Sequence, residues 1–379
     1  MFREIELERV QRKSGIDVWF SIFMILFMGM GLVALYTASV GYGTSMFDDP
    51  LHFFKSQVIF MGLGFVAMFV SMNISLDWLR SKVFVLSVVC LVLCLMVFLP
   101  FVGKEINGAS RWIGFGPVQF QPSELLKILF PLFISNLVDK RKNELNVPGR
   151  VFYPALIFSG VFCFVVVLQN DFSTAAFLFV LALLMLLMSG IPLRYFIALT
   201  AVIVPLGFIV VFSKEHRVYR LLSFFIPDYD VSGASYQVMA SLKAIGSGGF
   251  WGKGLGLGVK KLSSIPMVQS DFVFSAWAEE TGFLGVTSFF IILALFAWRG
   301  YKISLGSGSL FSSMFSFGCV SAIVLQSLMN LGVVVQALPV TGITLPFFSA
   351  GGSSYVVTMI MCGIILNISR NKIKETVNE

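Results

Sequence analysis

The sequence predicts an all-α integral membrane protein of about ten transmembrane helices, with a long extracytoplasmic loop before the eighth helix. Two observations support this fold class. Of the 379 residues, 57% are hydrophobic and only 12% are charged, whereas soluble proteins carry about 25% charged residues. The apolar residues also form blocks long enough to cross about 30 Å of hydrocarbon. We therefore exclude a water-soluble fold and expect a single membrane domain over residues 1–379.

The expected spans follow the apolar blocks in order, and Gly, Pro and Asn residues in the connections stop the helices. Short connections, such as those at 169–171 and 189–194, imply antiparallel neighbours. The spans are 17–38, 57–72, 82–102, 123–138, 151–168, 172–189, 193–213, 272–298, 309–337 and 350–369. All five cysteines fall inside these spans, which argues against a disulfide framework or a zinc site.

The orientation follows from the distribution of positive charge. Most of the 27 Lys and Arg residues lie on the side that holds the N-terminus, and cytoplasmic loops of membrane proteins are enriched in these residues. Both termini are therefore expected in the cytoplasm, and the loop 214–271 on the outer side. That loop is too small for a convincing separate domain, so it should lie on the membrane surface.

One helix is expected within this loop, in the stretch 235–246. Its apolar positions have helical spacing and should rest on lipid or on the helix bundle. Lys243 would then point away from this apolar side. The apolar positions are Val238, Met239, Leu242 and Ile245.

Several ionisable residues lie at the ends of spans or inside them. Charges at membrane depth cost a few kcal/mol, so they persist when they are paired or functional. Glu124 and Lys127 are three residues apart on one helix, so an internal salt bridge and a functional pair are both open. The full set is Arg111, Glu124, Lys127, Asp171, Asp271, Glu279 and Glu280.

Asp271 also has two interpretations. It could cap the N-terminus of the helix that begins beside it. Alternatively, it lies where the basic outer loop meets the membrane, where a carboxylate could take a proton from a hydroxyl group while nearby cations hold an anionic leaving group. Both interpretations stay open at this point.

The outer loop concentrates positive charge on the side where cations are less common. General attraction to anionic lipid headgroups would explain this charge, and a specific lipid diphosphate is the sharper alternative. The residues concerned are Arg217, Arg220, Lys243, Lys253, Lys260 and Lys261.

Two segments are rich in glycine. The run at 246–258 does not match a phosphate-binding P-loop, because Gly254 follows Lys253 where Ser or Thr is required. Its glycines would instead permit tight turns and a close backbone approach to a ligand. For the run at 338–355, a structured turn and direct substrate contact are both open.

Five long segments carry a recognisable pattern, at residues 107–127, 169–174, 236–256, 270–285 and 338–354. They resemble the signature segments of the SEDS family (shape, elongation, division and sporulation), and the resemblance covers nearly the whole chain, in order. It implies a ten-helix peptidoglycan glycosyltransferase that polymerises lipid II at the outer face of the cytoplasmic membrane and releases undecaprenyl diphosphate. It also implies a class B penicillin-binding protein and other divisome membrane proteins as partners, and no nucleic acid.

The resemblance assigns site residues by position. Asp271 matches the essential aspartate of the family and is the expected catalytic base. The sequence shows no metal cage, so whether a divalent cation, Mg²⁺ or Mn²⁺, assists the leaving group stays open. A lipid II flippase and a scaffold that only recruits a partner are the competing functions. The expected substrate-binding residues are Arg111, Glu124, Lys127, Asp171, Arg217, Arg220, Lys243 and Lys253.

The chain departs from the family pattern at three positions. Met267 stands where Glu is usual, Gln269 where His is usual, and Asn170 where Pro is common. Neither Met267 nor Gln269 can therefore be given an acid–base role. The segments at 236–237, 254–262 and 343–346 favour the division branch of the family over the elongation branch, whereas the LPVTG at 338–342 also occurs in the elongation branch.

Overall fold

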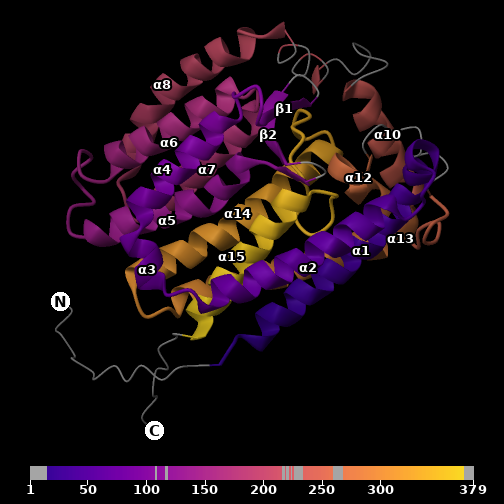
Figure 1. The fold of residues 1–379 in the computed structure, drawn as a ribbon, viewed down its shortest axis with the longest axis horizontal. Coiled ribbons are helices and arrows are strands. Elements are labelled where there is room, and N and C mark those ends of the chain that lie inside the picture. The colour runs from indigo at the N-terminus through magenta and orange to yellow at the C-terminus, as the bar shows by residue number, and fades with distance from the viewer. Residues whose placement is uncertain are drawn as a thin grey trace.

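The computed structural model describes residues 15–106, 109–115, 118–215, 218, 222, 224–225, 234–258 and 268–370. Its main body is a bundle of long helices (Figure 1). The first helix begins, and the last helix ends, at the same end of this bundle. That arrangement agrees with an even number of passages through the bundle.

Each of the ten expected spans coincides with a helix. Five of them, α1, α2, α13, α14 and α15, are long and apolar enough to cross a membrane. The helical membrane fold class is therefore confirmed, whereas the number of crossings stays a prediction. The helices are α1 (Val18–Phe47), α2 (His52–Asn73), α4 (Val83–Met96), α5 (Leu126–Lys140), α6 (Phe152–Leu168), α7 (Phe172–Met188), α8 (Leu193–Phe212), α13 (Val273–Leu305), α14 (Leu310–Val334) and α15 (Gly352–Arg370).

The helices α14 and α15 form the centre of the bundle (Figure 1). Of the most apolar stretch of each helix, 83% of the residues are buried in α15 and 67% in α14, against only 11% in α2. Helix α15 packs along α2, and α14 packs against α5 and α13. Side chains of α14 can therefore contact both α5 and α13.

A cluster of phenylalanines fixes the segment between α14 and α15. The ring of Phe348 lies 6.0 Å from that of Phe27 on α1 and 5.1 Å from that of Phe289 on α13, both in edge-to-face geometry. Aromatic pairs prefer this geometry because their ring edges and faces carry opposite partial charges. The cluster anchors the loop that approaches Asp271.

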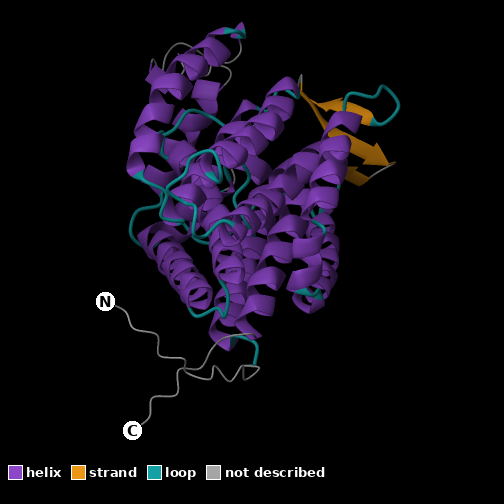
Figure 2. Ribbon diagram, turned by 90° about the vertical axis from the view of Figure 1, so that its left-hand side faces the viewer, coloured by secondary structure: helices purple, strands orange, loops and turns teal. Residues whose placement is uncertain are grey.

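A small sheet lies outside the helical prediction. Helix α4 ends at Met96, several residues before the expected end of its span, and three short antiparallel strands follow in the order β1-β2-β3. They lie at one edge of the bundle (Figure 2). Gly103 permits the turn, because a Cβ atom there would overlap the Val97 carbonyl oxygen. The remaining short elements before α5 are α3 (Leu76–Ser81), β1 (Gly103–Ile106), β2 (Ala109–Phe115), β3 (Val118–Phe120) and the 3-10 helix η1 (Pro122–Leu125).

The helix expected in the outer loop is present as α10 (Ala234–Ser247). It packs against α13 and α14, so it rests on the bundle. Its buried side consists of Val238, Ser241 and Ala244, whereas Met239 is 37% exposed, so contact of Met239 with lipid stays a prediction. Lys243 is exposed, as predicted. Small side chains, rather than the largest apolar ones, allow the close contact with the bundle.

Candidate active site

Asp271 lies where three parts of the chain meet. It is the last residue of the short helix α12 (Val268–Asp271) and is half-buried. The residue that precedes α13 is Phe272, so the interpretation of Asp271 as the N-cap of that helix is wrong. A Cβ atom built on Gly342 would lie 3.7 Å from the Asp271 carboxylate oxygen Oδ2. The carboxylate therefore faces the loop that joins α14 to α15.

Asn330 holds Asp271 against this loop. Its Nδ2 atom donates to the backbone oxygen of Asp271 at 2.9 Å and to that of Ile343 at 2.8 Å. Both hydrogens of the amide are then used, and the side chain is only 2% exposed. On the other side, the amide of Ala350 donates to the backbone oxygen of Gln269 at 2.8 Å. These bonds fix the backbone on which the Asp271 side chain stands.

The segment 338–355 forms a structured turn. The Leu345 amide donates to Ser349 Oγ at 2.8 Å, and Gln326 Nε2 donates to the Thr344 backbone oxygen at 2.8 Å. Polar side chains thus satisfy backbone groups that helices would otherwise satisfy, as buried irregular segments of membrane proteins require. This confirms the structured turn, and direct contact between the segment and a substrate stays a prediction.

Glu124 and Lys127 form the internal salt bridge. The Lys127 Nζ atom lies 2.7 Å from Glu124 Oε2 and donates at 2.8 Å to the Oε1 atom of Gln326 on α14. Both charged side chains are almost fully buried. A buried ion pair offsets its desolvation cost only when further hydrogen bonds complete it, and Gln326 supplies one. Gln326 also bonds to Thr344, so the pair is coupled to the loop beside Asp271.

Arg111 and Asp171 are brought together although they are far apart in the sequence. Arg111 Nη1 on β2 lies 3.5 Å from Asp171 Oδ1, and Gln121 Nε2 donates to Asp171 Oδ2 at 3.0 Å. Asp171 caps α7 by accepting from the Thr174 amide at 3.3 Å, and it is only 2% exposed. The carboxylate thus orients a partly exposed guanidinium group at the edge of the bundle.

Asn170, which replaces the proline common in the family, has a φ of +60°. Asn tolerates this left-handed conformation, whereas the ring of proline holds φ near −65°. The turn that presents Asp171 therefore depends on the substitution that this chain carries.

Lys253 is held by a buried carboxylate. Its Nζ atom lies 2.5 Å from Glu279 Oε1 and donates to Ser247 Oγ at 2.7 Å. Glu279 is 1% exposed, whereas the Lys253 side chain is 33% exposed. The ammonium group therefore reaches the surface, and the buried Glu279 carboxylate balances its charge.

The glycine-rich segment approaches protein backbone closely. Helix α13 is broken at Gly282, whose φ of 62° and ψ of −157° are essentially restricted to glycine. The amides of Lys253 and Gly254 donate to the carbonyl oxygens of Glu279 and Glu280, each at 3.0 Å. On the other side of the break, the Phe283 amide donates to Gly249 at 2.9 Å. The close approach predicted from the glycines is thus made to α13, and contact with a ligand stays a prediction.

The structure does not gather the whole expected basic set at one point. Arg111 and Lys253 lie in ion pairs on different elements, and Lys243 is exposed on α10. Arg217 and Arg220, with Lys260, Lys261 and Met267, lie outside the described residues. Within the described ranges, no three His, Cys, Asp or Glu side chains form a metal-sized cluster.

Sequence reasoning missed two carboxamides, one of which joins the Glu124–Lys127 pair to the loop 338–355 and the other Asp271 to the same loop. Gln326 and Asn330 are four residues apart on α14, so they share one face of the helix, and both are almost fully buried. A signal was available, because two carboxamides at this spacing interrupt an otherwise apolar predicted span. Uncharged amides are less costly in a membrane than charges, which is why they were overlooked.

The sequence matches the cell cycle protein family of FtsW, RodA and SpoVE over residues 17–374. A probable peptidoglycan glycosyltransferase FtsW of Borreliella burgdorferi is 39% identical over 361 residues, covering 94% of this chain and 98% of that protein. The stage V sporulation protein E of Bacillus subtilis is 35% identical, covering 95% of this chain and 98% of that protein.

Two solved structures have the same fold. A chain of a peptidoglycan synthase complex, whose structure concerns the coordination of polymerization and crosslinking, superposes with a TM-score of 0.80 at 26% identity, covering 95% of this chain and 99% of that one. The rod shape determining protein RodA of Thermus thermophilus gives 0.69 at 26% identity, covering 95% and 98%. The chain therefore belongs to the cell cycle protein family of FtsW, RodA and SpoVE, the SEDS family.

Proposed function

We propose that this protein is a peptidoglycan glycosyltransferase that polymerises lipid II into β-1,4-linked glycan strands, with Asp271 as its general base. The observation that carries the proposal is the placement of Asp271. Its backbone is fixed through Asn330 and its carboxylate is half-buried beside Gly342, at the mouth of the bundle. A general base must be held in place yet remain accessible to substrate. Family membership and the names of the curated relatives support the same activity.

The chemistry requires one base. The acceptor hydroxyl oxygen O4 of N-acetylglucosamine attacks C1 of the donor N-acetylmuramic acid, and Asp271 takes the hydroxyl proton. The new C1–O4 bond forms as the bond between C1 and the diphosphate oxygen breaks, so undecaprenyl diphosphate leaves with the bonding electrons. Because an α-linked donor gives a β-linked product, a single inverting displacement is sufficient.

Cations would stabilise the leaving diphosphate without protonating it. Arg111 and Lys253 are suited to this role, because each is partly exposed and is held by a buried carboxylate. Lys243 adds an exposed charge on α10. Arg217 and Arg220 complete the proposed set. Glu124, Lys127 and Asp171 are almost fully buried, so we assign them to positioning the groups that contact substrate.

We further propose that the site faces the outside of the cytoplasmic membrane and that both termini lie in the cytoplasm, because this orientation follows the positive-inside rule. A class B penicillin-binding protein is the proposed partner. The peptidoglycan synthase complex that this chain resembles supports that proposal. The similarity to an FtsW glycosyltransferase supports the proposal of septal synthesis rather than elongation.

The decisive experiment compares two aspartate variants. Purified protein with fluorescent lipid II, with and without the partner transpeptidase, should form polymer in the wild type and none in Asp271→Asn. Asp48→Asn is the matched control, because Asp48 is an exposed aspartate at the C-terminus of α1 and adopts a left-handed conformation that Asn also tolerates. Normal polymer from folded Asp271→Asn would remove the base assignment.

The same protein reconstituted in liposomes tests the flippase alternative. A polymerase consumes lipid II supplied from outside. A flippase would instead expose lipid II that starts in the inner leaflet, and it would do so without Asp271. If neither activity occurs with the partner present, the scaffold alternative is the remaining one.

A further inference from the structure

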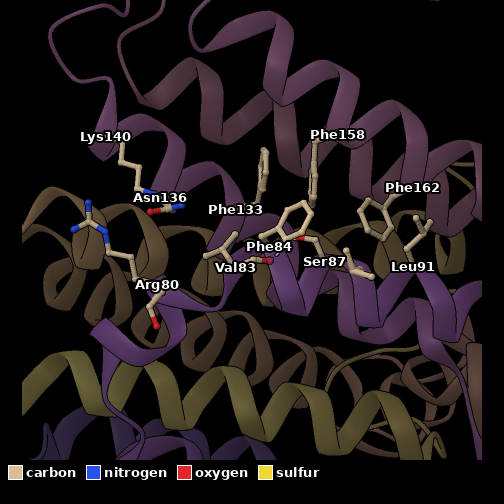
Figure 3. A pocket seen from close by; sticks show the side chains of 12 residues that line it. Arg80, Val83, Phe84, Ser87, Leu91, Phe133, Asn136, Lys140, Phe158 and Phe162 are labelled. Carbon is tan, nitrogen blue, oxygen red and sulfur yellow. Dashed lines mark hydrogen bonds between the residues drawn. The ribbon is translucent and has the colours of Figure 1, made fainter.

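A cavity of about 390 Å³ lies between α4, α5 and α6, away from the candidate active site. Figure 3 shows that it has two chemically different ends. Lys140, Asn136 and Arg80 lie at one end, and Phe158, Phe162 and Leu91 lie toward the other. The volume is within the range of ordinary ligand sites, about 300–1,000 Å³. The cavity is therefore a candidate site for an amphipathic molecule.

The apolar end of the cavity is open to the hydrocarbon layer. Phe84 on α4 is 78% exposed at its margin. Phe133 and Phe158 form a stacked pair with ring centroids 3.7 Å apart, so they present a smooth apolar wall. Exposed apolar side chains on a spanning helix face lipid tails. A flexible alkyl chain fits such a wall, whereas a polar solute would find no hydrogen-bond partner on it.

The polar end carries positive charge. Lys140 is exposed and forms no salt bridge with a described residue. Arg80 is partly balanced by Asp139 and lies 5.4 Å from the ring of Phe311. The Asn136 side chain lies beside Lys140 (Figure 3), and its buried Oδ1 atom accepts no hydrogen bond within the described part of the chain. This end therefore offers a cation and an unpaired amide oxygen, a hydrogen-bond acceptor, together.

Arg80 at the polar end belongs to α3, which lies at the same end of the bundle as the last residues of α15 (Figure 1). Lys140 is the last residue of α5, whereas Lys127 is near its start. At 1.5 Å per residue these two lysines are about 20 Å apart along the helix. The cavity thus opens toward the other leaflet from the proposed glycosyltransferase site.

We propose that this cavity binds one anionic glycerophospholipid of the cytoplasmic leaflet. One acyl chain lies between α4 and α6, and the phosphate group contacts Lys140 and Arg80. A hydroxyl group of the headgroup, as in phosphatidylglycerol, donates to the buried Oδ1 atom of Asn136. Basic pockets between spanning helices on the cytoplasmic side have the charge and depth that anionic headgroups require. The proposal does not depend on the glycosyltransferase activity.

The test measures lipid binding to the full-length protein in detergent by native mass spectrometry. The probes are dioleoyl phosphatidylglycerol and dioleoyl phosphatidylcholine, which differ in headgroup charge but not in acyl chains. Wild-type protein should bind the anionic lipid about five-fold more tightly, since one Lys near an anionic lipid surface has roughly this effect. Lys140→Gln should remove the preference. Lys142→Gln is the control, because Lys142 is exposed nearby but does not line the cavity.

A second pair of variants tests the acyl-chain position. Ser87 lines the cavity, so Ser87→Phe should fill it and weaken the binding of both lipids about five-fold or more. Thr200→Phe on the exposed side of α8 should not. If Ser87→Phe does not fold, Val88→Phe replaces it, because Val88 also lines the cavity.

Three results would overturn the proposal. The first is equal affinity of the wild type for the two lipids. The second is the same loss of preference in Lys142→Gln as in Lys140→Gln, which would indicate general surface attraction. The third is wild-type binding by a folded variant with a filled cavity.

Discussion

Replacing Asn330 with Leu should disable polymerisation without touching any group that contacts substrate. The wild-type amide donates to two backbone oxygens, in a part-buried hydrogen bond to that of Asp271 and a buried one to that of Ile343. Leu has a similar size but no donor, so both oxygens lose a partner. A buried polar group without a partner costs about 1–3 kcal/mol, so the variant should lose about 2–4 kcal/mol and melt several degrees lower.

The larger effect should be on the reaction rate. Without the bridge, the segment that carries Asp271 is no longer fixed to the loop at Ile343. A misplacement of the base by about 1 Å lowers the rate roughly a hundred-fold. We expect the polymerisation rate of Asn330→Leu to fall at least ten-fold at a temperature where the protein is still folded.

Gln57→Leu is the matched control. Gln57 is also a buried carboxamide in a spanning helix, but its Nε2 atom has no hydrogen-bond partner in the described part of the chain. Its replacement should leave the melting temperature and the polymerisation rate nearly unchanged. The assay is the initial rate of lipid II polymerisation, normalised to folded protein by size-exclusion chromatography. A folded Asn330→Leu protein with the wild-type rate would refute the positioning argument.

Three further variants test other parts of the site. Lys127→Met leaves the Glu124 carboxylate buried without its cation and should lower the free energy of unfolding by about 3–5 kcal/mol, seen as a large drop in melting temperature. The double variant with Glu124→Gln should recover much of this stability. No recovery would argue against a coupled pair. Gly252→Ala should lower the melting temperature, because a Cβ atom there would overlap the Glu280 backbone and φ is +79°. Gly246→Ala is the control and should not lower it, because a Cβ atom at Gly246 meets nothing within 4 Å. Equal effects would contradict the close packing. Arg111→Leu should raise the lipid II concentration for half-maximal rate about ten-fold, in line with the loss of one charged hydrogen bond, and an unchanged value would remove Arg111 from the proposed substrate contacts.

The sequence was sufficient to place the spans but not their ends. Hydropathy identifies the stretch that crosses hydrocarbon, so every expected span coincides with a helix. Helix ends depend on caps and turns outside the hydrocarbon. For this reason α1 continues to Phe47, beyond the expected end at residue 38, and α4 stops at Met96. The sheet at 103–120 was missed because its strands are short and carry little periodic signal.

The site was predictable only where the contacts are local. Glu124 and Lys127 are three residues apart on one helix, so their salt bridge follows from helical geometry. Arg111 with Asp171, and Lys253 with Glu279, are joined only by the tertiary fold. No local spacing encodes these pairs, and for that reason all four were expected as separate charges.

The break in α13 has a structural consequence. Backbone hydrogen bonds join the segment 249–254 to α13 on both sides of Gly282, so they satisfy backbone groups that the break removes from the helix. The part of α13 before Gly282, which begins next to Asp271, is therefore joined to this segment by backbone hydrogen bonds. Trp251 lies within that segment and is 77% exposed. A molecule that binds Trp251 would therefore contact a segment that is hydrogen-bonded to the part of α13 next to Asp271.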